Sequence, residues 1–360
     1  MEPKSARDYD DVGAQAVLSV LLEIGQVLGV YRDRFVVIGG SVPWLLFPDA
    51  KPAHVGTLDI DLSLDAQALG EGDYKNLVES LEAAGYQRAA PDMKWFQLRR
   101  TVEFKGHAPI TVLIDLLMPR EAKFKRNKPP LLANFAVQKV HGAGVAMHSF
   151  VQHRINGTMP DGRPNSVELR VASIPALLLM KGYALAGRDK HKDAYDIYFS
   201  VREFEGGPDG LANACRQLLD DPIALAGFKH IASKFTSEAA FGPMTVRQFL
   251  GDSAALGHMT ADQVQVDAFR QVKAWLDRLG ICARPIRIFE NASGERSRGS
   301  CRSSLQRRTR RTFARRGLAR STSSTWGSHS GAGLPTHDAS VMSSFPAHTA
   351  LDAAIMPAKG

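Results

Sequence analysis

The spacing of apolar residues in the first third of the chain predicts helices and strands in mixed order. Residues 13–28 repeat apolar side chains at helical spacing on one face, which predicts a helix. Residues 35–38 form a short apolar strand that leads into a Gly-Gly-Ser turn. Residues 57–64 alternate strictly between polar and apolar, which predicts a strand with one buried face. A helix and two strands of a hairpin are predicted next, at 73–85, 95–104 and 110–117.

The pattern changes near residue 173 to one helix after another. Ser173 and Pro175 suit the start of the first helix, and Gly187 suits its end. Later helices are predicted at 191–201, 209–219, 222–234 and 261–279. We therefore expect an α+β protein with two folded domains. These are an α/β domain with a small mixed sheet at 1–170 and a helical domain at 171–285.

The last part of the chain, residues 286–360, has no apolar periodicity and is rich in Ser, Arg, Gly and Ala. We predict a disordered tail there. The tail holds 12 bases and four acids, whereas the rest of the chain holds 33 of each, so the formal charge of +8 belongs to the tail. The net charge of the whole chain therefore does not indicate what residues 1–285 bind. Its preference for Arg over Lys favours a read-through or out-of-frame extension, and an RNA-binding arm is the alternative.

Composition excludes several classes of protein. Cys215, Cys282 and Cys301 are widely spaced and form neither a disulfide framework nor a zinc-site spacing. The polar N-terminal sequence MEPKSARDYDD does not resemble a signal peptide. No uninterrupted apolar run reaches the length of a membrane span. We therefore expect a cytoplasmic protein with no membrane partner.

Three aspartates are the strongest candidates for chemistry. Asp59 and Asp61 are two positions apart on a predicted strand, so both carboxylates project from one face and can hold one or two hard cations. Asp115 lies in the otherwise apolar strand Ile110–Met118, where an unpaired carboxylate would be costly. A strand face in contact with water, and a structural salt bridge for Asp115, are the alternatives.

A small turn lies between the first strand and the next helix. Gly39 and Gly40 allow the backbone to approach a phosphate, and the N-terminus of the helix offers unpaired N–H groups. Ser41 is expected to cap the helix and to add a hydroxyl to the same cradle. A plain tight turn is the alternative.

A second group of charges lies on the predicted helices after residue 173. Lys181 is the only charge in the stretch 174–187 and either points at an anion, such as a phosphate, or extends to solvent. Asp193 and Asp196 share a helix face. Lys192 can pair with Asp196 at i,i+4, so a solvated surface of ion pairs is the alternative to a binding site.

These motifs together resemble one family. A Gly-Ser followed by Asp-x-Asp, and then a helical K-x-x-A…R-x-x-x-K-D-x-x-D, is similar to the AbiEii-type nucleotidyltransferases. These are the toxins of type IV toxin–antitoxin systems, within the polymerase-β-like superfamily. Lys181–Ala184 and Arg188–Asp196 match the second block, with a gap one residue shorter than usual. The nearest counterpart of the family's T-x-R motif is Leu98–Arg100, and the resemblance covers about residues 30–205.

The resemblance implies a polymerase-β-like fold and a Mg²⁺-dependent transfer of NMP from an NTP to an acceptor hydroxyl. The metal ligands, for two ions with the NTP, would be Asp59, Asp61 and Asp115. Asp193 would be an essential residue, as a base or an orienting group. The nucleotide-binding residues would be Gly39, Gly40, Ser41, Lys181, Arg188 and Lys192.

The resemblance also suggests an acceptor, RNA and first of all a tRNA 3′ end, and a cognate antitoxin as a partner. A basic run past Asp115 can hold acceptor phosphates, or is a solvated loop. The run is Arg120, Lys123, Lys125, Arg126 and Lys128. A protein hydroxyl and a small molecule are the second and third possible acceptors. A catalytically silent nucleotide-binding or nucleic-acid-binding module is the alternative from another class.

The tail gives a first prediction. Deletion of residues 291–360 should leave the melting temperature and NTP turnover nearly unchanged, because this stretch has no apolar pattern that could join a core. RNA affinity measured over a series of salt concentrations distinguishes the two interpretations of the tail. A read-through tail leaves the salt dependence unchanged. A markedly shallower dependence in the truncated protein would instead identify an electrostatic arm.

Overall fold

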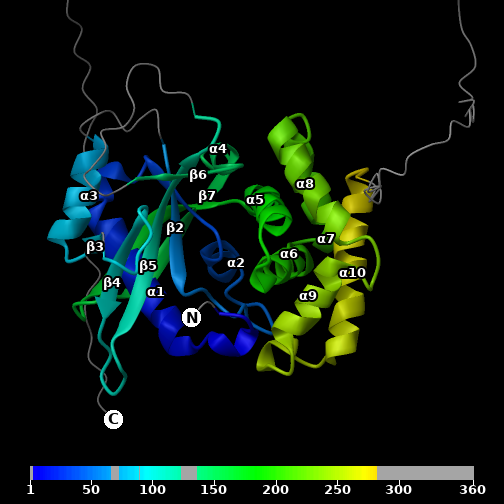
Figure 1. Ribbon diagram of the computed structural model, residues 1–360, viewed down its shortest axis with the longest axis horizontal. Coiled ribbons are helices and arrows are strands. Elements are labelled where there is room, and N and C mark those ends of the chain that lie inside the picture. The colour runs from blue at the N-terminus through cyan, green and yellow to red at the C-terminus, as the bar shows by residue number, and fades with distance from the viewer. Residues whose placement is uncertain (1–2, 66–72, 89, 123–135, 282–360) are drawn as a thin grey trace, which may run out of the picture. The chain divides into compact units, whose positions relative to one another are not determined.

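The computed structural model describes residues 3–65, 73–88, 90–122 and 136–281 (Figure 1). The strands are β1 (Phe35–Ile38), β2 (Asp59–Leu64), β3 (Gln87–Arg88), β4 (Gln97–Val102), β5 (Ile110–Pro119), β6 (Gln138–Val140), β7 (Phe150–Thr158) and β8 (Pro164–Ala172). The α-helices are α1 (Asp11–Val27), α2 (Ser41–Leu46), α3 (Asp73–Ala83), α4 (Ala143–Ala146), α5 (Ile174–Gly187), α6 (His191–Glu203), α7 (Gly207–Cys215), α8 (Pro222–Lys234), α9 (Phe241–Leu250) and α10 (Ala261–Arg278). The predicted α+β class is confirmed.

The described strands form one mixed sheet in the order β3-β4-β5-β2-β1-β8-β7, and β6 pairs with β5 beyond the end of β4. β2 runs antiparallel to β1 but parallel to β5, and β1 runs parallel to β8. The sheet is larger than the small sheet that we expected, because the hairpin of β7 and β8 extends it beyond β1. This hairpin was not predicted.

The strict alternation in β2 gives its two faces different roles. Ile60, Leu62 and Leu64 are fully buried. They belong to the apolar face that α1 covers, since α1 packs against β2, β4, β5, β7 and β8. Asp59 and Asp61 occupy the intervening positions and therefore project from the opposite face. The elements near that face are α2, which packs against β1 and β2, and α6, which packs against α2.

The helices after β8 pack on one another through a close crossing of α5 and α8. At this crossing the backbones touch, because Gly182 of α5 lies against the carbonyl oxygen of Gly227 on α8. A Cβ on Gly227 would in turn lie 2.5 Å from the carbonyl oxygen of Leu179. Two glycines facing each other allow the helices to approach this closely. The crossing fixes α5, from which Lys181 projects.

Most predicted elements are present within a few residues of their expected bounds. The helix α5 begins after the cap Ser173, whose hydroxyl accepts a hydrogen bond from the Ala176 N–H, as the sequence indicated. Ser41 differs from the expectation. It is the first residue of α2 rather than its cap, and its buried hydroxyl has no hydrogen-bond partner among the described residues.

Some predictions are not tested by the described residues. The tail from residue 286 falls outside the described residues, as do Cys282 and Cys301. The domain boundary at 170/171 stays a prediction, although strands do give way to helices between β8 and α5. Cys215 is buried as a free thiol. In the described part of the chain, every helix is too short or too polar to cross a bilayer.

The helix crossing gives a stability prediction. Gly182→Ala should lower the free energy of unfolding by about 2–3 kcal/mol, because its Cβ would overlap the Gly227 carbonyl oxygen and force α5 and α8 apart. Gly187→Ala is the matched control in the same helix, since a Cβ there has open space. Urea denaturation of both variants measures the difference. Equal stability of the two would show that the helices separate at no cost.

Candidate active site

Two of the three candidate aspartates lie directly opposite each other on neighbouring strands. In the parallel pair of β2 and β5, Asp61 is the register partner of Asp115, and Asp59 is the partner of Leu113. Asp59 and Asp61 share a face of β2 because they are two residues apart. The three carboxylates therefore belong to one region of the sheet, as their mutual electrostatic effects also indicate.

The glycine turn and the carboxylates touch. Gly39 adopts a left-handed conformation with φ of 74°, which favours glycine. A Cβ at Gly39 would overlap the carboxylate of Asp61. Only a residue without a side chain therefore allows Asp61 to lie over the turn between β1 and α2. The sequence-distant Gly-Gly-Ser and Asp-x-Asp motifs thus form a single contact.

Each of the outer carboxylates is held by a neighbouring polar side chain. The Thr57 hydroxyl donates to Oδ1 of Asp59 at 2.6 Å. The Gln97 amide donates to Oδ1 of Asp115 at 2.8 Å. With these hydrogen bonds in place, the described residues contain no group of three His, Cys, Asp or Glu side chains gathered around one metal position. The carboxylates are neighbours, but they do not converge on one point.

Crowding of the carboxylates changes their proton affinities. Burial, followed by the charges of Asp59 and Asp115, raises the pKa of Asp61 to about 8. Burial and the charge of Asp59 also raise the pKa of Asp115, against the Gln97 hydrogen bond. The pKa of Asp59 is lowered instead, because the effect of its burial is outweighed by Lys190, the Thr57 hydrogen bond, Lys192 and Lys181 together. Asp61 is thus the carboxyl of the group whose ionisation is most strongly opposed by its surroundings.

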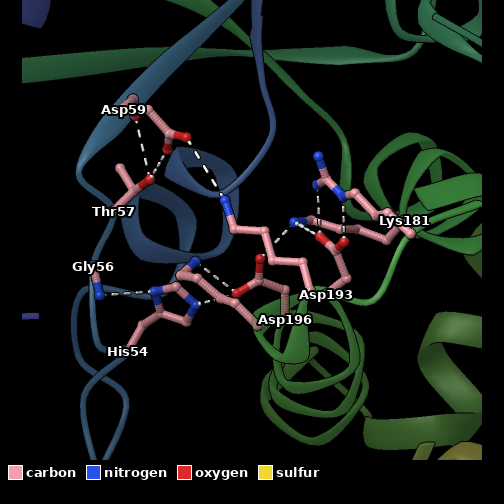
Figure 2. A network of polar contacts seen from close by, with 10 residues as sticks. His54, Gly56, Thr57, Asp59, Lys181, Asp193 and Asp196 are labelled. Carbon is pink, nitrogen blue, oxygen red and sulfur yellow. Dashed lines mark hydrogen bonds and ion pairs between the residues drawn. The ribbon is translucent and has the colours of Figure 1, made fainter. Parts of the chain in front are cut away.

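A second cluster of charges lies on α5 and α6 (Figure 2). Lys181 Nζ contacts Asp193 Oδ1 and Asp196 Oδ2, each at 2.7 Å. Lys192 Nζ donates to Asp196 Oδ1 at 2.8 Å. Arg188 forms a two-pronged contact with Asp193, from Nε at 2.8 Å and from Nη2 at 3.0 Å. Every carboxylate of this cluster is therefore paired with at least two cationic groups.

Most of these charged side chains are buried, whereas the alternative interpretation of the sequence was a solvated surface of ion pairs. The Lys181 and Lys192 side chains are only 9% and 4% exposed, and Asp193 and Asp196 are fully buried. The Arg188 side chain is 55% exposed, so it is far more open to solvent than the two lysines. The pairing of Lys192 with Asp196 at i,i+4 is present, but it is buried. The Lys181 ammonium is occupied by two carboxylates rather than free.

The charged cluster reaches the glycine turn. A Cβ at Gly40 would lie 2.9 Å from the ammonium of Lys192 and 3.0 Å from the hydroxyl of Thr57. The same ammonium lies 5.6 Å from the ring centroid of Tyr9, which is a cation–π distance. The helical motif and the sheet motif therefore meet at Gly40, although 152 positions separate it from Lys192 in the chain.

The structure adds a histidine that the sequence did not suggest. His54 is buried, and its Nδ1 accepts a hydrogen bond from the Gly56 N–H at 3.1 Å. The proton is therefore on Nε2, which donates to Asp196 Oδ1 at 3.0 Å (Figure 2). Burial and the nearby Lys192 lower the pKa of His54 to about 4, so the ring is neutral at pH 7. No local pattern marks His54.

Three other residues of this region were also missed as site residues. Thr57 and Gln97 hold the outer carboxylates, and Lys190 Nζ lies 3.9 Å from Asp59 Oδ2. The strand alternation places Thr57 on the face of Asp59, and this signal could have identified it. Lys190 lies inside the charged run that drew attention to Lys192, but its partner is 131 residues away.

Comparison with known proteins gives distant likenesses. No family model matches the sequence, and no curated protein matches it. The chain is similar to the solved structure of an antigenic nucleotidyltransferase-like protein from Paracoccidioides brasiliensis. The identity is 15% and the TM-score 0.35, over 63% of this chain and 95% of that one. It is also similar to JHP933 from Helicobacter pylori, at 12% identity and a TM-score of 0.36, over 74% and 94% of the two chains. Likenesses this distant carry no argument about activity.

The raised pKa of Asp61 gives a prediction about stability. Below about pH 4, Asp61 is protonated in both the folded and unfolded states. Between pH 4 and 8 the unfolded chain releases this proton, whereas the folded protein retains it, so folding requires the uptake of a proton. That cost grows as the pH rises. Asp61→Asn removes it, and should therefore raise the free energy of unfolding by at least about 1 kcal/mol at pH 8, with no gain at pH 4. Thermal melts in EDTA across this range measure the difference, and a gain independent of pH would contradict it.

Proposed function

We propose that this protein is a Mg²⁺-dependent nucleotidyltransferase, which transfers NMP from an NTP to an acceptor hydroxyl and releases pyrophosphate. One observation carries the proposal. Asp61 and Asp115 lie opposite each other on parallel strands, and Asp61 lies over Gly39 in a turn that suits a phosphate. A fold gains no stability from forcing partly buried carboxylates together, so their crowding indicates a functional constraint.

The donor set fits a hard divalent cation. Asp59, Asp61 and Asp115 offer only carboxylate oxygens, which Mg²⁺ prefers. A cation would also relieve the repulsion that raises the pKa of Asp61. Asp59 and Asp115 would exchange their hydrogen bonds from Thr57 and Gln97 for the cation. When bound, two ions would supply the electrostatic stabilisation of the attacking and leaving oxygens.

The residues of the turn and of Arg188 would bind and orient the triphosphate. The buried Ser41 hydroxyl lacks a partner among the described residues, which supports a role as a phosphate ligand. Gly39 and Gly40 leave the backbone open to a close approach. Arg188, whose side chain is half-exposed, is the best placed of the predicted cations, because Lys181 and Lys192 are buried in ion pairs.

In this proposal three of the predicted residues do not contact the nucleotide but support the groups that do. They are Lys181, Lys192 and Asp193. Burial works to raise the pKa of Asp193, but Lys181 and Arg188 outweigh it and lower that pKa. A carboxylate held by two cations is a poor proton acceptor, so Asp193 orients Arg188 rather than acting as a base. Lys181 and Lys192 add positive charge beside the turn, and Lys192 reaches Gly40.

We propose RNA as the acceptor, with a tRNA 3′ end first, and an AbiEii-like toxin activity with a cognate antitoxin. The support is the sequence resemblance together with the basic run that follows Asp115. Arg120 of this run lies at the end of β5, and the remainder of the run falls outside the described residues. A protein hydroxyl or a small molecule would use the same chemistry on the phosphate.

Turnover by metal-ligand variants tests the proposal. Asp61→Ala should abolish pyrophosphate release from NTPs, because it removes a metal ligand without removing core packing. The wild-type protein should lose activity in EDTA and regain it with Mg²⁺. Ser63→Ala is the matched control, because Ser63 is two positions further along the same face of β2 and is buried. It should retain activity.

The acceptor is found by incubating the protein with each α-labelled NTP and total RNA and identifying the labelled species. Label in a tRNA fraction supports the proposed acceptor, whereas label in the protein or in a small molecule replaces it. Equal turnover by wild type and Asp61→Ala, or activity that survives EDTA, would exclude the metal-dependent mechanism.

A further inference from the structure

Lys190 is held differently from the other cations of the charged cluster. Lys181 and Lys192 make contacts of 2.7–2.8 Å with fully buried carboxylates. Lys190 instead makes a single contact of 3.9 Å with Asp59 Oδ2, which is longer than a hydrogen bond. Its side chain is 20% exposed, and that of Asp59 is 36% exposed. The pair therefore lies at the border of the site with solvent, where a lysine side chain can move.

The backbone of Lys190 is held by a hydrogen bond, whereas its ammonium makes only the 3.9 Å contact with Asp59 among the described residues. Lys190 is the N-cap residue of α6, and its carbonyl oxygen accepts the hydrogen bond of the Asp193 N–H at 3.0 Å. This hydrogen bond holds the Lys190 backbone, and with it the base of the side chain, in place beside the carboxylates. The four-carbon chain above it remains free to place its charge on one partner or another.

The charge of Lys190 acts on all three carboxylates. Its positive charge favours the ionised form of Asp59, and it acts in the same direction on Asp61 and Asp115. Oδ2 of Asp59 has no hydrogen bond from a described residue, whereas Oδ1 accepts from Thr57. Lys190 thus neutralises the carboxylate oxygen that is open to another ligand.

We propose that Lys190 is a built-in competitor of the divalent cation. It neutralises Asp59 while the cation is absent, and it releases this carboxylate when the cation binds. The inference rests on the proposed function, because it takes the three aspartates as the cation site. Its consequence is that Lys190 weakens the binding of the metal alone while it stabilises the metal-free protein. A lysine with only a structural role would strengthen both metal binding and the stability of the metal-free protein, or it would strengthen neither.

Manganese binding to the full chain tests the competition, with Mn²⁺ alone as the probe and free Mn²⁺ measured by electron paramagnetic resonance. Lys190→Gln should bind Mn²⁺ about fivefold more tightly than wild type, which is the scale of one partly exposed ion pair. Lys190→Arg keeps the charge and should bind no more tightly than wild type. Lys229→Gln, at an exposed lysine on α8, controls for the loss of one positive charge elsewhere and should bind as wild type does.

Thermal melts of the same proteins give the second measurement. Lys190→Gln should melt below wild type in EDTA, and its melting temperature should rise more than that of wild type when Mn²⁺ is added. Unchanged or weaker Mn²⁺ binding by Lys190→Gln would overturn the inference while leaving the proposed function intact. If Asp61→Ala bound Mn²⁺ as tightly as wild type, the metal would not be at the carboxylates, and both proposals would fail.

Discussion

Asp196 is a fully buried carboxylate that three parts of the chain must reach together. Lys181 comes from α5, Lys192 from α6 itself, and His54 from the segment before β2. A buried carboxylate is costly unless charged or polar donors satisfy it, so the loss of any one of these contacts should be strongly destabilising. Because His54 has its proton fixed on Nε2 by the Gly56 N–H, it can serve only as a donor to this carboxylate.

The candidate site depends on that arrangement. Thr57 follows His54 by three residues and holds Asp59, so the segment that contacts the helices also orients a carboxylate of the sheet. On the other side, Lys192 brings a positive charge next to Gly40. Crowded carboxylates on β2 and β5 thus face a cluster of cations on α5 and α6. The protein keeps unfavourable charges close together on the sheet and compensates for them with charges from the helices.

The sequence predicted the parts of this arrangement that have a local signal. Alternation placed Asp59 and Asp61 on one face of β2, and the apolar surroundings of Asp115 singled it out. The cap at Ser173 defined α5. The contact of His54 with Asp196 spans 142 residues and follows from no period or motif. The hairpin of β7 and β8 was missed because β7 is an edge strand with mostly polar, exposed positions, although Val167, Leu169 and Val171 alternate along β8.

The contacts of Asp196 also limit how such a protein could arise by recombination. A gene fragment that ended after Ala172 would encode the whole sheet and its carboxylates, but His54 would lose its acceptor Asp196 and the rings of Tyr195 and Phe199 that pack against it. The complementary fragment would encode Lys181, Lys192 and both helical aspartates, but would lack the imidazole donor. Neither half is therefore an exchangeable module. A sheet and a helical region taken from two different ancestors would fit only if residues 54 and 196 were inherited as a pair.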